Sequence, residues 1–143
     1  RRRHTRFALA RGLGDVYKRQ NLTRLEIAGC KYVTDASIRH LTKMTRILIS
    51  NVRQITCNSL RHLPNLTRLT ALHFEYNFDF SKLTNLRTLK IIYNTDTASS
   101  IRYLTNLTSL SLFSVLNITE DHIRPLTNLR KLNIKYCNKH QRR

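Results

Sequence analysis

The sequence has few of the residues that interrupt a fold or anchor a chain in a membrane. Among its 143 residues there are only three Gly and two Pro, and there is no Trp. So little Gly and Pro excludes a linker-like or low-complexity chain. No apolar run approaches the roughly 20 residues that a membrane-spanning helix needs, while hydrophobic residues make up 41% of the chain. We therefore expect one soluble, folded domain.

Cysteine and acidic residues are also scarce. The three cysteines, Cys30, Cys57 and Cys137, are odd in number and stand at no metal-ligand spacing. Without a disulfide framework, an intracellular and cytoplasmic setting is favoured, and no reliable targeting signal is present. Eight acidic residues against 26 basic ones give a formal charge of +18. Residues 21–143 hold 19 of the basic and seven of the acidic residues, so this part keeps a charge of +12.

Residues 1–20 have two interpretations. They begin without Met, and Asp15–Gln20 reads as the translation of GAT GTG TAT AAG AGA CAG, which resembles a transposon end used in sequencing libraries. Arg1–Arg6 and Arg11–Gly14 resemble translated adapter and primer sequence in the matching order. The alternative is a nuclear or mitochondrial signal, or an arm for nucleic acid. We favour the adapter interpretation, which makes these residues non-native or disordered and the true N-terminus missing.

From residue 21 onward the chain repeats one pattern. Its unit is Leu-x-x-Leu-x-Ile/Leu-x-x-Cys/Asn, and the first copy reads Leu22, Leu25, Ile27 and Cys30. Self-similarity at a period near 20 residues is typical of a stacked repeat architecture. We place the copies at residues 22, 44, 69, 86, 107 and 129. The repeat domain is thus residues 21–143, with about five full repeats and a partial one, truncated at one or both ends.

This pattern resembles the leucine-rich-repeat family. Cys30 followed by Val33-Thr34-Asp35 is similar to the cysteine-containing subclass that occurs in F-box-associated proteins. The family resemblance implies an α/β solenoid, a curved right-handed stack with short parallel strands on the concave side and short helices or loops on the convex side. It also implies a scaffold that binds a protein partner. The subclass implies the substrate-recognition part of a larger assembly such as a ubiquitin ligase.

Local patterns agree with a strand and a short helix in each repeat. The Leu-x-Leu core alternates with period two, as a half-buried strand does. Apolar residues three apart then follow, which fits one helical face. The third copy leaves too few residues for a helix, so residues 77–80 are expected to be extended or turn-like. Further expectations are N-caps at Thr34, Thr56 and Thr119, and full burial of Leu89, Leu110 and Leu112.

Asn-x-Thr sequons occur at four places in phase with the repeat. They are Asn21, Asn65, Asn106 and Asn117. Glycosylation is one explanation. The repeat consensus, with asparagines forming a polar ladder, is the favoured one.

The outward residues of neighbouring strands predict a binding patch. Strands lie about 4.8 Å apart, so Ile92 and Phe113 should be neighbours, with Tyr76, Tyr93 and Lys90 beside them. Contiguous exposed apolar and aromatic residues indicate a protein-binding surface. The alternative is that a missing flank or an ascending loop covers them.

Basic residues form two further groups. Arg24 and Arg46 should make a basic spot on the strand face, where the assumed register also turns Ala71 and His73 outward. On the helices, Arg39, Arg61, Arg102 and Arg124 should point to solvent. A solvated face is the simplest explanation of this helix column. The second hypothesis for the whole chain is a basic electrostatic module that binds nucleic acid or anionic surfaces, with binding that weakens steeply in salt.

Catalytic chemistry has little support in the sequence. Cys57 and His62 are five residues apart without an evident orienting acid, and His40 and His62 occupy one repeat position. No motif for a metal, a nucleophile or a phosphate stands out. We therefore expect no enzyme activity, no cofactor and no metal.

Overall fold

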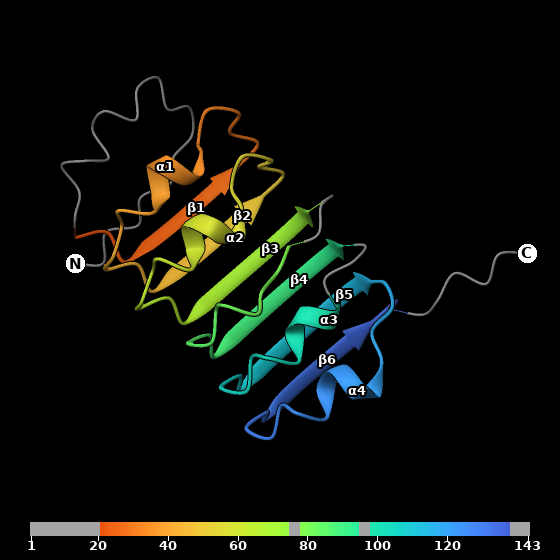
Figure 1. Cartoon of the computed structure of the whole chain (residues 1–143). Coiled ribbons are helices and arrows are strands. Elements are labelled where there is room, and N and C mark those ends of the chain that lie inside the picture. Colours follow the sequence, from red (N-terminus) through yellow and green to blue (C-terminus); the bar gives the residue numbers. More distant parts are fainter. Residues whose placement is uncertain (1–20, 75–77, 95–97, 138–143) are drawn as a thin grey trace, which may run out of the picture.

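The computed structural model describes residues 21–74, 78–94 and 98–137. The predictions for residues 1–20 and for Tyr76 lie outside the described residues. The chain forms a sheet with one short helix or loop between successive strands (Figure 1).

Six strands pair in sequence order, each parallel to the next, in an open sheet (Figure 1). Short parallel strands arise here because each Leu-x-Leu core places its apolar residues on one face, where the next repeat continues the same core. The strands are β1 (Arg24–Ala28), β2 (Arg46–Ser50), β3 (Arg68–Phe74), β4 (Thr88–Asn94), β5 (Ser109–Val115) and β6 (Lys131–Lys135).

The described residues include four single-turn helices, which lie on one side of the sheet (Figure 1). They are α1 (Asp35–Ile38), α2 (Cys57–Leu60), α3 (Ala98–Ile101) and α4 (Glu120–Ile123). The predicted N-caps Thr34, Thr56 and Thr119 are confirmed, and each has an extended backbone. The first two helices are also joined, because the Asp35 carboxylate accepts hydrogen bonds from the Thr56 N–H at 2.7 Å and from its hydroxyl at 2.5 Å.

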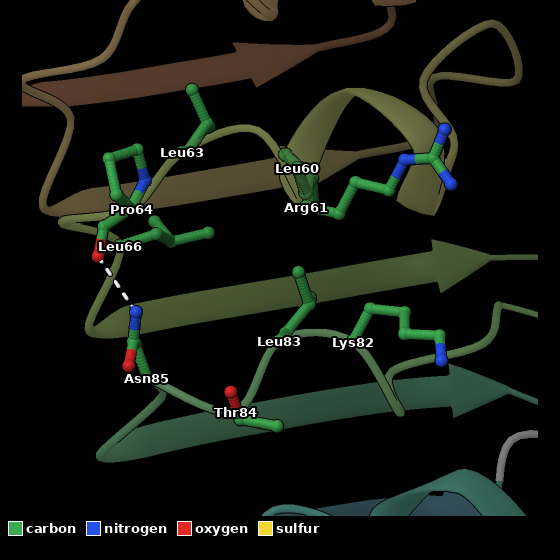
Figure 2. Close-up of a pocket in the computed structure, with 9 residues that line it drawn as sticks. All are labelled: Leu60, Arg61, Leu63, Pro64, Leu66, Lys82, Leu83, Thr84 and Asn85. Atoms are coloured by element: carbon green, nitrogen blue, oxygen red, sulfur yellow. Dashed lines mark hydrogen bonds between the residues drawn. The ribbon is translucent and has the colours of Figure 1, made fainter.

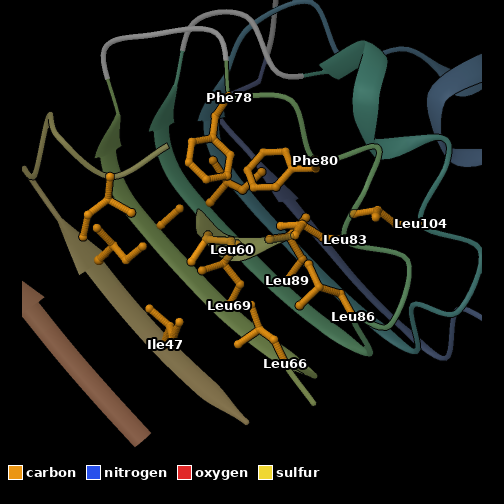
Figure 3. Close-up of a cluster of buried hydrophobic side chains, with 14 of the residues drawn as sticks. Ile47, Leu60, Leu66, Leu69, Phe78, Phe80, Leu83, Leu86, Leu89 and Leu104 are labelled. Carbon is orange, nitrogen blue, oxygen red and sulfur yellow. The ribbon is translucent and has the colours of Figure 1, made fainter. Parts of the chain in front are cut away.

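One continuous core fills the space between the sheet and the helix side (Figure 3). Leu89, Leu110 and Leu112 are 0%, 1% and 1% exposed, so their predicted burial is confirmed. At β6 the inward residues Leu132 and Ile134 are 50% and 40% exposed. Within the described residues no strand lies beyond β6 to cover them.

Strand pairing corrects the third repeat boundary. Ile47 lies level with Leu69, and Ile49 lies level with Ala71. The third repeat therefore begins at Leu66, not at Leu69, and Ala71 points into the core with 2% exposure. The sequence pattern fits both starts, because Leu66, Leu69 and Leu72 are equally spaced. The hydrogen-bonded register with β2 decides between them.

The repeat between β3 and β4 has no helix in its described residues, 78–87. Phe80 stands three residues before Leu83, as Ile38 stands before Leu41, and its ring is fully buried. Its N–H donates to the Ser100 hydroxyl of α3 at 3.1 Å. As predicted for this repeat, residues 78–80 form no helix. A buried aromatic ring replaces the helical turn as core filler.

Asparagine side chains connect successive repeats along the helix side. Each Nδ2 donates to a backbone carbonyl of the preceding repeat at 2.9–3.0 Å, and the donors are Asn65, Asn85, Asn106 and Asn128. Two of these residues begin sequons and two do not. The polar-ladder explanation is therefore confirmed for Asn65 and Asn106, whose amides satisfy carbonyls that the short turns leave free.

Candidate functional site

The side of the sheet that faces away from the helices, which we call the open face, corresponds to the predicted concave side. Because side chains alternate along a strand, its residues are those between the buried core positions. They form three rows that cross the strands. The rows are Arg24, Arg46, Arg68, Thr88, Ser109 and Lys131; Glu26, Leu48, Thr70, Lys90, Ser111 and Asn133; and Ala28, Ser50, Leu72, Ile92, Phe113 and Lys135.

Aromatic side chains gather where strands β3 to β6 end. Ile92 and Phe113 lie level on adjacent strands, as expected, and both are half-buried. The rings of His73 and Tyr93 stack with centroids 4.9 Å apart. Tyr93 then meets Phe113 edge to face at 5.8 Å, and Phe113 meets Tyr136 at 4.9 Å. We call His73, Tyr93, Phe113 and Tyr136 the ring ladder. They are linked across four strands, with Tyr93 and Tyr136 50% and 74% exposed.

The backbone that carries the ring ladder is strained. His73, Tyr93 and Tyr136 have φ values of 53°, 56° and 55°. The equivalent residues of the other repeats, Gly29, Asn51 and Ser114, also have positive φ. This left-handed conformation suits Gly and Asn and costs other residues on the order of 1 kcal/mol or more. Three of the six repeats therefore hold a large ring where the backbone favours a small residue.

Sequence reasoning placed only part of this site. Tyr93, Ile92 and Phe113 lie together, and the exposed Lys90 lies on the middle row between Thr70 and Ser111. Tyr76 lies outside the described residues. The predicted binding patch did not include His73, Leu72 and Tyr136, which also lie at this end. If the third repeat is started at Leu66, His73 falls level with Tyr93. This alignment could have shown from the sequence that His73 belongs to the site.

A row of three arginines lies at the opposite corner of the open face. Arg24 lies level with Arg46, and Arg46 lies level with Arg68. The predicted basic spot therefore extends to a third residue, which the misplaced third repeat had hidden. We call these three residues the arginine row. On the described open face the other charged residues are Lys90, Lys131 and Lys135, against the single carboxylate of Glu26.

The arginines on the helix side are exposed, as predicted, and each has a local partner. Their residues are Arg39, Arg61, Arg102 and Arg124. Arg39 donates to the neighbouring His40 ring at 3.1 Å, and Arg124 pairs with Glu120 at 3.2 Å. The Arg102 guanidinium lies 5.9 Å from the Tyr103 ring centroid. These contacts are those of a solvated surface.

The geometry gives Cys57 no nucleophilic character. Burial, reinforced by the negative charge of Asp79 in the next repeat, raises the pKa of its thiol to about 12. A thiol with so high a pKa carries almost no thiolate at neutral pH. The pKa of Asp79 is lowered, because its carboxylate accepts hydrogen bonds from the Ser81 N–H and hydroxyl. Among the described residues no three His, Cys, Asp or Glu side chains gather as metal ligands.

A small pocket lies on the helix side between the second and third repeats (Figure 2). Its wall combines Leu63 and Leu83 with the polar Asn85, whose side chain donates to the Pro64 carbonyl at 2.9 Å. Its volume of about 30 Å³ holds about one water molecule. The pocket is thus a gap between repeats and is too small for an organic ligand. None of the described helices is long and apolar enough to cross a membrane.

Comparison with known proteins tests the fold. No family model and no curated protein matches the sequence. Among solved structures the chain is similar to the crystal structure of an internalin from Listeria monocytogenes, with a TM-score of 0.64 and 24% identity over 80% of this chain. The fold is a leucine-rich-repeat solenoid. The chain covers 35% of that internalin, so the likeness concerns the repeat stack.

Proposed function

We propose that this leucine-rich-repeat chain is a protein-binding scaffold and not an enzyme. Its partner binds the open face, centred on Ile92 and Phe113 and flanked by Tyr93, Lys90 and the undescribed Tyr76. The observation that carries the proposal is the ring ladder, in which exposed rings occupy backbone positions that favour small residues.

Energetics supports this choice of surface. A ring at a left-handed position costs on the order of 1 kcal/mol in the free chain, and half-exposed rings recover little of that by burial. Strained residues that the fold does not need are typical of functional sites. Aromatic side chains are also enriched among the residues that dominate binding energy at protein interfaces.

A finer proposal assigns the scaffold to the substrate-recognition part of a larger intracellular assembly, such as a ubiquitin ligase. It rests on the resemblance of the first repeat to the cysteine-containing subclass. In the structure, Val33 is buried, Thr34 is the N-cap of α1, and the Cys30 thiol donates to the Ala28 carbonyl at 3.3 Å. These are structural roles for the residues that carry the resemblance. Reconstitution with the flanking parts of the complete reading frame tests this assignment.

We also propose that the native domain is residues 21–143 and that residues 1–20 are translated adapter sequence. Genomic DNA decides this directly. The same twenty codons in an unprocessed genome would contradict it, whereas their absence upstream of the codon for Asn21 is the expected result.

The alternative function is electrostatic binding of nucleic acid or anionic surfaces. The charge of +12 over residues 21–143 and the exposed helix arginines favour it. Binding to phosphates would fall steeply between low and high salt. Binding through apolar contacts on the open face would not weaken steeply with salt.

The test is capture of partners with the full chain, followed by paired substitutions. Ile92→Ala with Phe113→Ala should weaken binding at least tenfold, which is about 1.4 kcal/mol, because it removes the centre of the apolar patch. Arg39→Ala with Arg61→Ala is the matched control on the helix side and should leave binding nearly unchanged. Essential helix arginines and a silent Ile92/Phe113 pair would support the electrostatic alternative instead.

A further inference from the structure

The arginine row and the ring ladder lie at opposite corners of the same face. The arginines stand at the first outward position of β1, β2 and β3, while the rings stand at the ends of β3 to β6. Their separation follows from sheet geometry, with strands about 4.8 Å apart and about 3.3 Å of rise per residue. Arg68 is then about 16 Å from Phe113, and Arg46 is about 20 Å from it.

The surface between the two corners carries one charge, that of the exposed Lys90. A line from Arg68 on β3 towards Phe113 on β5 crosses β4 at Lys90, two residues beyond Thr88, which lies level with Arg68. Thr70 and Leu72 beside this line are half-buried, and the positive charge of Lys90 would lie along the path of an acidic segment. A main chain can therefore lie against this strip and reach both corners.

We propose that the partner is an extended protein segment that crosses the open face obliquely. Its carboxylates bind the arginine row, and its aromatic or aliphatic side chain packs on the ring ladder. This inference rests on the proposed function and adds the chemistry of the partner. An extended segment covers the distance with about five or six residues, so the acidic and apolar groups stand that far apart in its sequence.

Charge and geometry both favour an acidic peptide. Arginine binds carboxylates through paired N–H donors, and the described open face has six basic side chains against one carboxylate. Neither Arg24 nor Arg68 forms an ion pair with a described residue. Single-stranded nucleic acid would need free ring faces for base stacking. Here the rings stack on or abut one another at 4.9–5.8 Å, which leaves no slot for a base between them.

The experiment is selection of displayed random 12-residue peptides on the full chain. Parallel selections use Arg46→Gln with Arg68→Gln, Ile92→Ala with Phe113→Ala, and the helix-side control Arg39→Gln with Arg61→Gln. The native chain and the control should enrich peptides with acidic residues about five or six positions from an apolar residue. The Arg46/Arg68 variant should lose the acidic preference alone, and the Ile92/Phe113 variant the apolar one.

Affinity measurements on one enriched peptide sharpen the test. Replacing its acidic residues with amides should weaken binding to the native chain about fivefold, with less than a twofold change on the Arg46/Arg68 variant. Equal losses on both chains would overturn the inference.

The remaining outcomes separate this inference from the proposed function. Apolar enrichment without an acidic preference overturns the inference and leaves the proposed function standing. Peptides that bind the Ile92/Phe113 variant as well as the native chain contradict both. A labelled single-stranded RNA that displaces the enriched peptide, and binds more tightly than it does, overturns the inference in favour of nucleic acid.

Discussion

The two ends of the open face share one backbone and differ in chemistry. At the β1 and β2 end, the residues with a left-handed backbone are Gly29 and Asn51, which suit that conformation. Towards β4 and β6, Tyr93 and Tyr136 occupy the equivalent places and are strained there. The register of the strands is continuous between the two ends. The repeat thus sets where a side chain stands, and the residue at each place sets the chemistry of the surface.

The first prediction tests whether the two ends rest on the same core. Ile47 lies beneath the arginine end and Leu110 beneath the aromatic end, and both are buried. Substitution of either by Ala should reduce the free energy of unfolding by about 2–5 kcal/mol, measured by urea denaturation. Leu132 occupies the same repeat position as Leu110 but is half-exposed, so Leu132→Ala should cost about 1 kcal/mol or less. A large cost at Leu132 and a small one at Leu110 would show that the core is not continuous.

The second prediction compares one repeat position at the two ends of the helix side. The second repeat has the half-buried Cys57 at the place where α4 has the exposed Glu120. Because the pKa of the Cys57 thiol is raised to about 12, its alkylation by iodoacetamide at pH 8 should be on the order of a hundredfold slower in the folded chain than in urea. Peptide mapping of the alkylated chain measures this rate.

The raised pKa of Cys57 also predicts the direction in which the stability of the chain changes with pH. The folded thiol holds its proton more tightly than the unfolded one, so the contribution of Cys57 to stability is complete below pH 9. This contribution to stability should decline as the pH rises from about 9 towards 12. Equal alkylation rates in the folded and unfolded chains would contradict the burial of this side chain.

The third prediction concerns the left-handed positions. Ser114→Gly should stabilise the chain by about 1 kcal/mol, because it relieves a strained φ, and Gly29→Ala should destabilise it by a similar amount. The loss of stability expected at Gly29 comes from the backbone conformation and not from a steric clash, since an added Cβ would meet nothing within 4 Å. Thermal unfolding of the two variants measures both changes in stability. Opposite signs are required, so a stabilised Gly29→Ala variant would refute the assignment of strain.

The smallest effect is expected at the exposed ion pair of α4. Arg124 and Glu120 are 3.2 Å apart, with side chains 71% and 83% exposed. Arg124→Ala should change the free energy of unfolding by no more than about 0.5 kcal/mol, because solvent screens such pairs. Arg61→Ala, which removes no ion pair with another described residue, is the control. A loss above about 1 kcal/mol for Arg124 alone would give this helix-side arginine a structural role.

Much of the fold was readable from the spacing of leucines. The Leu-x-Leu alternation predicted strands, and the threonines four residues before an apolar position predicted where helices begin. The third repeat was placed wrongly because Leu66, Leu69 and Leu72 are equally spaced, so two starts fit one pattern. That error turned Ala71 outward and kept Arg68 out of the arginine row.

The sequence by itself determined that this chain stacks repeats, because a strand and a single helical turn cannot bury their apolar faces alone. It also determined that Ile92 and Phe113 share a surface, since both follow inward residues by one position. Only the tertiary structure decided the register of the third repeat, the replacement of its helix by Phe80, and the contact between the rings of His73, Tyr93, Phe113 and Tyr136. The physical reason is that hydrogen bonds between neighbouring strands fix the register, and register alone determines which side chains meet.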